Sequence, residues 1–269
     1  MFAPKTIDPH FVTFGGISFS YHGECDLMMV RSERFGFGKG LEVHIRTKYR
    51  MNYSYINGVA IKIGGEVLEV LADGSLALNG FETAVDTIES INQFSYFPLR
   101  KRIQGKHKNI IVYHLSFGKE DDENGRGHIE VRANSKTGML FLDVVGSFSD
   151  SVGMLGSSQV EGLFTRDGKK DLTDEWNSYG EEWQVQGNDP KLFMVNRAPQ
   201  HPTGCRYEAE DEHRRFRGRR LEDKSGVDTT IEVATDACVG AKGHKKQFCI
   251  FDVMATGDLD IAEDSFYNK

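Results

Sequence analysis

The run Asp8-Pro9-His10 joins three residue types that together can break a peptide bond. An aspartate carboxyl can attack its own carbonyl carbon, and the tertiary amide nitrogen of Pro9 is a good leaving group once it is protonated. The imidazole of His10 could act as the general acid or base for that step. The alternative, which we favour, is that this run starts an edge β-strand in which His10 is packed or capped.

Four cysteines, Cys25, Cys205, Cys238 and Cys249, are the next candidates for covalent chemistry. None lies in a Cys-x-x-Cys pair, which argues against a zinc knuckle or a thioredoxin-type redox site. An even number of cysteines fits a secreted protein with disulfide bonds, although buried free thiols would give the same count. The cysteines therefore favour structural bonds over catalysis.

Acidic residues gather in two short runs, one of which holds the three aspartates Asp167, Asp171 and Asp174. Aspartate is common in turns and helix caps, and we favour that explanation for all three. The acidic run at residues 120–125 imitates the first half of an EF-hand loop, but its twelfth position is Val131 instead of glutamate. Because that glutamate is a bidentate calcium ligand, we reject an EF-hand.

Two short motifs are candidate modification sites. The sequon that begins at Asn52 is an acceptor sequence for N-linked glycosylation, and it suits a secreted protein if the side chain is exposed. Arg217, Arg219 and Arg220 form a basic run similar to a furin-type processing site. Runs of charge are more commonly a solvated helical face, which is the interpretation we favour for these arginines.

An enzyme would need a catalytic constellation that this sequence does not offer. It contains no Gly-x-Ser-x-Gly elbow, no His-Glu-x-x-His motif and no glycine-rich phosphate loop. His22 is expected in a turn and His44 on the polar face of a strand, both at the surface. Trp176 and Trp183 are expected to pack in the core, although an exposed tryptophan could stack on carbohydrate. We therefore predict no enzymatic activity.

Residues 8 to about 200 must position these groups, and their pattern is that of antiparallel strands. Apolar and polar residues alternate at residues 41–46, which is the period of a strand with one buried face. Glycine-containing turns at residues 64–65 and 73–74 separate neighbouring runs as hairpins. Further strands are expected at residues 109–117, 127–132 and 139–145. Short connections between successive strands favour a two-sheet sandwich.

After about residue 200 the sequence becomes charged and then helical. Residues 208–224 are dense in charge, with acidic residues ahead of basic ones, which is the favourable order in a helix. Residues 228–238 and about 246–255 are predicted to form two short helices. The apolar face of the second helix would comprise Ile250, Val253 and Met254.

Composition limits the classes of partner. Of the 269 residues, 39% are hydrophobic, which is enough to bury a core at this size. The net charge of −7 disfavours nucleic acids and anionic membranes as general partners, and no apolar stretch is long enough to span a bilayer. The first five residues lack the pattern of a secretory leader, so we expect a removed leader or a piece of a longer chain.

Several segments of the chain follow one another in the order of a known family. They are Asp8-Pro9-His10-Phe11-Val12-Thr13-Phe14-Gly15-Gly16, residues 40–47, Gly153-Met154-Leu155-Gly156-Ser157 and Tyr179-Gly180-Glu181-Glu182-Trp183-Gln184-Val185. In this order and spacing they resemble the von Willebrand factor type D domain over residues 8–185. Residues 249–258 are similar to the Cys-x-x-Asp-x-x-x-Thr-Gly-Asp segment that follows type D domains in some cell-surface and mucin-like proteins.

The resemblance implies a mostly β protein, an antiparallel two-sheet β-sandwich with a small C-terminal α-helical cap. It implies a Cys25–Cys205 disulfide that ties the first strands to the segment after the last one. It also implies a Cys238–Cys249 disulfide that closes the cap. The family builds adhesive, gel-forming and matrix proteins, so the expected location is extracellular or at the cell surface.

The chain departs from the family at residues that would bind calcium. Gly15 stands where the family has an aspartate, and Ser157 stands where it has an asparagine. Calcium needs six to eight oxygen ligands, so the loss of two should weaken the site. We expect no required cofactor, with calcium as an alternative for which Asp167 and Asp171 are weak candidate ligands.

Two further departures affect covalent chemistry. Leu155 replaces the loop cysteine of the family, so one disulfide of the usual set is absent. Ile7 replaces the glycine that precedes Asp8 in family members that cleave themselves, and a side chain there restricts the backbone twist that the attack needs. Self-processing at the Asp8–Pro9 bond is therefore a minor hypothesis.

These observations predict three parts: residues 1–200 as a type D-like β-sandwich, residues 201–227 as a charged linker or helix, and residues 228–269 as a disulfide-closed helical cap. The expected function is a non-enzymatic extracellular module for structure, adhesion or protein interaction in a matrix or at a cell surface. Its expected partners are proteins or glycans, and an oligomer is compatible with the sequence. The alternatives are a calcium- or carbohydrate-dependent binding module and a self-processing domain.

Overall fold

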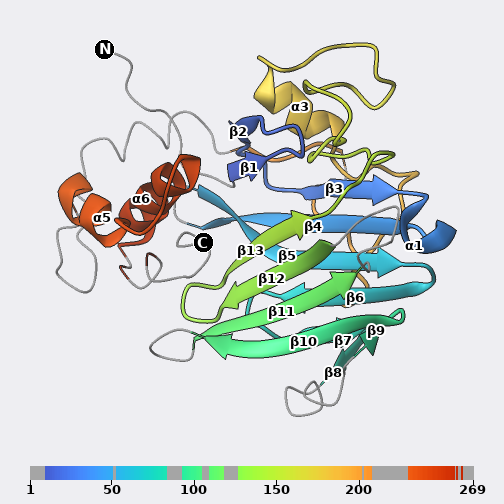
Figure 1. The fold of residues 1–269 in the computed structure, drawn as a ribbon, viewed down its shortest axis with the longest axis horizontal. Coiled ribbons are helices and arrows are strands. Elements are labelled where there is room, and N and C mark those ends of the chain that lie inside the picture. Colours follow the sequence, from blue (N-terminus) through green and yellow to red (C-terminus); the bar gives the residue numbers. More distant parts are fainter. Residues whose placement is uncertain are drawn as a thin grey trace.

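A computed structural model describes residues 10–50, 53–83, 93–104, 109–117, 127–201, 203–207, 230–257, 259 and 262. The strands are β1 (His10–Val12), β2 (Ser18–Ser20), β3 (Asp26–Ser32), β4 (Leu41–Arg50), β5 (Tyr53–Ile63), β6 (Glu66–Leu71), β7 (Leu76–Leu78), β8 (Phe81–Thr83), β9 (Gln93–Phe94), β10 (Phe97–Gln104), β11 (Ile110–Phe117), β12 (Gly127–Asn134) and β13 (Met139–Val145). The helices are α1 (Phe35–Gly38), α3 (Trp176–Glu182), α5 (Ile231–Ala237) and α6 (His244–Thr256). We call the described part of residues 10–207 the body and that of residues 230–262 the cap, which lies at one end of the body (Figure 1).

Antiparallel pairing organises the body. One sheet of 11 strands runs in the order β8-β7-β6-β5-β13-β12-β11-β10-β9, with β4 paired to β5 and β3 paired to β4. A separate two-stranded sheet joins β1 to β2. The predicted fold class, mostly antiparallel β with a small helical cap, is confirmed.

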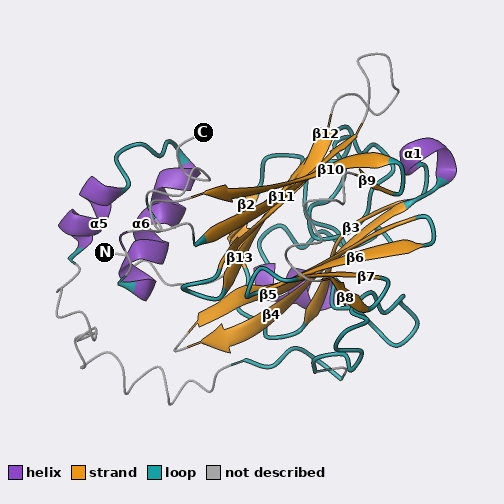
Figure 2. Ribbon diagram, turned by 90° about the horizontal axis from the view of Figure 1, so that it is seen from below, coloured by secondary structure: helices purple, strands orange, loops and turns teal. Residues whose placement is uncertain are grey.

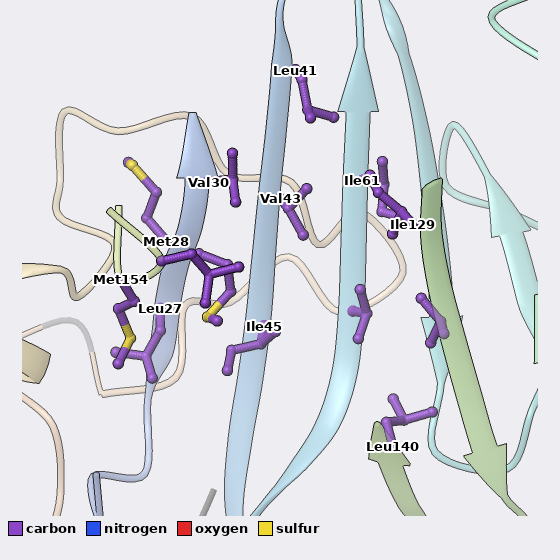
Figure 3. Close-up of a cluster of buried hydrophobic side chains, with 14 of the residues drawn as sticks. Leu27, Met28, Val30, Leu41, Val43, Ile45, Ile61, Ile129, Leu140 and Met154 are labelled. Atoms are coloured by element: carbon purple, nitrogen blue, oxygen red, sulfur yellow. The ribbon is translucent and has the colours of Figure 1, made fainter. Parts of the chain in front are cut away.

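The large sheet folds over itself into two layers, β3–β8 and β9–β13 (Figure 2). The layers are joined where Leu140 of β13 pairs with Ile56 of β5. Apolar side chains from both layers, including Val43, Ile61 and Ile129, form the main core between them (Figure 3). The two layers of the expected sandwich therefore belong to one hydrogen-bonded sheet.

The predicted hairpin turns are present. The second one needs glycine at position 74, both for its backbone angle and for its close approach to the other layer. Gly64 begins the turn between β5 and β6 with φ +60°, and Gly74 lies in the turn between β6 and β7 with φ +82°. A Cβ atom at position 74 would lie 2.6 Å from Cδ1 of Ile111 in the other layer. The Gly74 carbonyl also accepts a 2.7 Å hydrogen bond from the hydroxyl of Tyr113. This turn therefore fixes the contact between the two layers.

The outer face of β4 is buried, contrary to the expectation of a surface histidine. His44 is only 1% exposed, and its Nε2 lies 3.0 Å from Oε1 of Glu42. Arg46 forms a two-pronged ion pair with Asp26, with nitrogen–oxygen distances of 2.6 and 2.7 Å. Residues 193–198 cover this face, and two of their carbonyls accept hydrogen bonds from Arg46. The prediction failed because this covering segment is far away in sequence.

The cap is built from the two predicted helices. Thr230 caps the start of α5 by accepting a hydrogen bond from the Val233 backbone, and Gly257 ends α6 with a left-handed conformation. The expected apolar face of α6 needs correction, because Val253 is buried but Met254 is 36% exposed. Among the described residues, no helix is long and apolar enough to cross a membrane.

Candidate interaction site at the joint between body and cap

Two disulfides are formed, one between distant parts of the chain and one within the cap, and they are the pairs that the family resemblance implies. Cys25 bonds to Cys205 with a sequence separation of 180, and Cys238 bonds to Cys249 with a separation of 11. The first bond lies beside a short bridge between Glu24 and Arg206, which exchange backbone hydrogen bonds of 2.8 and 3.1 Å. In the loop-entropy model, these closures contribute about 5 and about 3 kcal/mol respectively. The second disulfide holds α5 against α6.

A small apolar cluster joins the cap to the body. Tyr55 of β5 and Met139 of β13 come from the body, and Phe141 packs against them. The cap contributes the residues Ala234, Cys238, Ala241, Cys249, Val253 and Ala262. The disulfide thus lies inside the cluster, so closing the cap and docking it onto the body share the same buried surface.

His10 forms the aromatic part of this joint. Its ring stacks on Phe248 of α6 with centroids 4.1 Å apart and an interplanar angle of 8°. Phe251 meets the same imidazole edge-on at 5.2 Å. Nδ1 of His10 lies 2.9 Å from the hydroxyl oxygen of Ser20, while Nε2 is buried without a hydrogen-bond partner.

Burial in this stack controls the charge of His10. Desolvation, together with the nearby His22, lowers the pKa of His10 to about 4. The imidazole is therefore neutral at neutral pH. The structure places this residue, which the sequence offers as an acid or base for cleavage, in a packing role between body and cap.

A cavity of about 330 Å³ lies next to the stack, between β1, β13 and α6. Consecutive residues line it on two sides, at 10–14 and at 139–144. A strand that turns one face to a cavity lines it with alternate residues, so β1 and β13 present their edges here. The α6 side contributes Lys245, Phe248 and Asp252. This mostly apolar arrangement suits packing and binding and offers no evident nucleophile.

Sequence reasoning missed Phe248 as a joint residue. The available signal was the spacing of Lys245, Phe248 and Asp252, which are three and four residues apart and so share one face of a helix. The prediction instead gave the apolar face as Ile250, Val253 and Met254. The partner of Phe248 is far away in sequence, so no local pattern identifies the stack.

The candidate calcium residues Asp167 and Asp171 are engaged in local turns. Asp167 accepts hydrogen bonds from the Thr165 hydroxyl and the Lys169 backbone, at 2.7 and 3.1 Å. Asp171 accepts from the backbone and hydroxyl of Thr173, at 2.8 and 2.5 Å. These hydrogen bonds, from Thr165 and Thr173 in the first place, lower the pKa of each carboxyl. Both residues are exposed at the surface.

The two loops that carry calcium ligands in the family do meet. Phe14 donates a 2.9 Å backbone hydrogen bond to Leu155, next to Gly15. The Ser157 hydroxyl donates to the Ser149 carbonyl at 3.0 Å, and Leu155 is buried where the family has a cysteine. Within the described ranges, no three or more His, Cys, Asp or Glu residues are placed to hold a metal ion. Calcium binding therefore stays an untested alternative.

Other candidate residues lie outside the described part of the chain. They are Asp8, Pro9, Asn52, Arg217, Arg219 and Arg220, together with the acidic run at 120–125 and the charged run at 208–224. The predictions for the Asp8–Pro9 bond, the sequon and the basic run therefore stand as sequence-based hypotheses. Of the tryptophans, Trp183 is buried in the core as expected, whereas Trp176 is 45% exposed.

One comparison with known families bears on the cap. Residues 225–265 match the family model described as a mucin-4-like C8-3 domain. No curated protein matches the chain in sequence. The match includes α5, α6 and their disulfide, so it supports a relationship with mucin-like proteins through the cap. The matched family is a C8-3 domain and not the type D domain that the motifs of the body resemble.

Proposed function

We propose that this chain is a non-enzymatic extracellular module whose body and disulfide-closed cap form one unit for protein interaction in a matrix or at a cell surface. The C8-3 match of the cap and the two disulfides support an extracellular location. The resemblance of residues 8–185 to type D domains supports a role in assembly or adhesion.

The docked cap is the observation that carries this proposal. The stack of His10 on Phe248 and the apolar cluster around Cys238–Cys249 attach the cap to the edges of β1 and β13. A cap that is closed by its own disulfide and packed against the body presents a fixed surface to a partner. Fixed surfaces favour binding because less conformational entropy is lost in the complex.

The test is retention of the secreted chain on an extracellular matrix. The tagged chain would be produced through the secretory pathway and applied to decellularised matrix, together with the variants Phe248→Ala and Met254→Ala. Both variants shorten a side chain of α6, but only the first removes a contact with His10. We expect retention of the native chain and of Met254→Ala, and weaker retention of Phe248→Ala. Retention no greater than that of an unrelated secreted protein would overturn the proposal.

A second candidate function is carbohydrate binding by the body. The observation that favours it is the exposed Trp176, which the packing of the fold does not explain. Its site is separate from the joint with the cap.

A further inference from the structure

Trp176 is presented to solvent with a fixed ring. The side chain is 45% exposed, whereas Trp183, at the other end of α3, is 5% exposed. The indole Nε1 of Trp176 donates a 3.0 Å hydrogen bond to the Thr173 carbonyl. That hydrogen bond satisfies the indole N–H and holds the ring in place. The apolar faces of the ring therefore remain available for contact with a ligand.

A hollow of about 400 Å³ opens beside this ring. We call it the Trp176 hollow. It is lined by Ser20, His22, Asp174, Glu175, Trp176, Asn177 and Ser178. Apart from the indole, every lining side chain is polar or charged, in contrast to the mostly apolar cavity at the joint.

The fold brings the two walls of the Trp176 hollow together through Tyr21 and Gly180. Tyr21 is fully buried directly after β2, and its two neighbours, Ser20 and His22, both line the hollow. A Cβ atom at position 180 would lie 2.0 Å from Cδ2 of Tyr21. Only glycine therefore lets α3 approach the end of β2 this closely. Ser20 is further fixed by its 2.9 Å contact with Nδ1 of His10.

This lining selects a class of ligand. An indole face needs an apolar, flat partner, while carboxylate, amide and hydroxyl groups need hydrogen-bond donors and acceptors around the rim of that partner. A pyranose ring has both, because one face carries C–H groups and the edge carries hydroxyls. The carboxylate of Asp174 disfavours anionic ligands, since like charges repel, whereas the carboxylate of Glu175 is paired with Lys170 at 3.0 Å.

We propose that the Trp176 hollow binds a neutral saccharide. One sugar ring stacks on the indole of Trp176, and its hydroxyl groups bind the side chains of Asp174 and Asn177. The proposal does not depend on the function proposed for the joint between body and cap, because the hollow is formed by residues of the body alone.

The test is an NMR titration of the two indole N–H signals. The probes are the methyl glycosides of galactose, N-acetylgalactosamine, N-acetylglucosamine and mannose, with choline as a cationic probe. We expect at least one glycoside to shift the Trp176 signal and leave that of buried Trp183 in place. The variant Trp176→Phe assigns the signals.

Two variants separate this site from chance contacts. Trp176→Ala should weaken binding of the active glycoside by about tenfold or more, which corresponds to the loss of one aromatic stacking contact and its buried area. Phe81→Ala is the matched control, because Phe81 is 78% exposed on β8 and its loss should leave binding unchanged. The proposal is overturned if no glycoside shifts the Trp176 signal, if only choline does, or if Trp176→Ala binds as tightly as the native chain.

Discussion

The imidazole ring of His10 lies parallel to the phenyl ring of Phe248, with their centroids 4.1 Å apart and their planes differing by 8°. This contact joins the first described strand of the body to the last helix of the cap. Because Nε2 of His10 is buried without an acceptor, the stack tolerates the neutral imidazole but not the charged form. The joint is therefore coupled to pH.

Acid should weaken the joint through His10. Its folded pKa of about 4 lies below the ordinary value of 6.5, so the unfolded state binds the proton more readily. The contribution of His10 to the free energy of unfolding is therefore fully present above pH 6.5 and is lost as the pH falls toward 4. The total loss is about 3 kcal/mol. Chemical unfolding at a series of pH values measures this loss.

The variant His10→Phe separates this effect from other acid-sensitive groups. His22 on the body lies close enough to act on the charge of His10, and Lys245 and Asp252 on α6 line the adjacent cavity. Phe keeps the aromatic stack but cannot take up a proton. The free energy of unfolding of His10→Phe should fall less than that of the native chain between pH 6.5 and 4. Parallel curves of stability against pH for the two proteins would refute the role of His10.

Phe248→Ala should destabilise docking of the cap by about 2 kcal/mol, because the lost ring is partly buried in the joint. The effect should appear as faster hydrogen exchange in α5 and α6, with little change in the strands of the body. Met254→Ala, on the exposed side of the same helix, should cost much less. Equal effects of the two variants would show that the stack does not hold the cap.

Removing the cap disulfide by the double substitution Cys238→Ser and Cys249→Ser should cost about 3 kcal/mol, the value for a loop of this length. The two sulfur atoms also lie inside the apolar cluster that joins cap and body, so the substitution should loosen the contact with Tyr55 as well. Limited proteolysis should then cut the cap first. An unchanged proteolysis pattern would contradict the proposed link between cap closure and docking.

Arg46→Ala should destabilise the body by about 3–5 kcal/mol, because the buried carboxylate of Asp26 loses the guanidinium with which it forms an ion pair. Arg34→Ala is the matched control. The side chain of Arg34 is 74% exposed, and its ion pair with Asp150 has a distance of 3.6 Å. Thermal unfolding should show an effect below about 1 kcal/mol for this exposed pair. Similar losses for the two variants would contradict the burial of the β4 outer face.

Local sequence patterns predicted the strands and turns but not what lies against them. Alternation at residues 41–46 identified β4, and Gly64 and Gly74 identified hairpins, since both signals depend on neighbouring residues only. Phe193, which covers Arg46 on the outer face of β4, lies more than a hundred positions further along the chain, and so does Phe248, the partner of His10. Alternation alone could not show that the polar face of β4 is covered.

The sequence also predicted part of the candidate site, namely the disulfides and the cap helices. The two disulfide pairs were implied by the resemblance to type D domains and to the segment that follows them, and both are present. The cap helices follow from capping residues and spacing. The exposure of Trp176 did not follow, because a tryptophan near a helix start has the same local pattern whether it packs inward or outward.

The most direct test of the central claim is a count of free thiols in the secreted chain, unfolded without reductant. The account has one disulfide within the body, Cys25–Cys205, and one that closes the cap, Cys238–Cys249. We predict no reactive thiol before reduction and four after it, in line with the four cysteines of the chain. Four reactive thiols before reduction would contradict both the extracellular location and the closed cap.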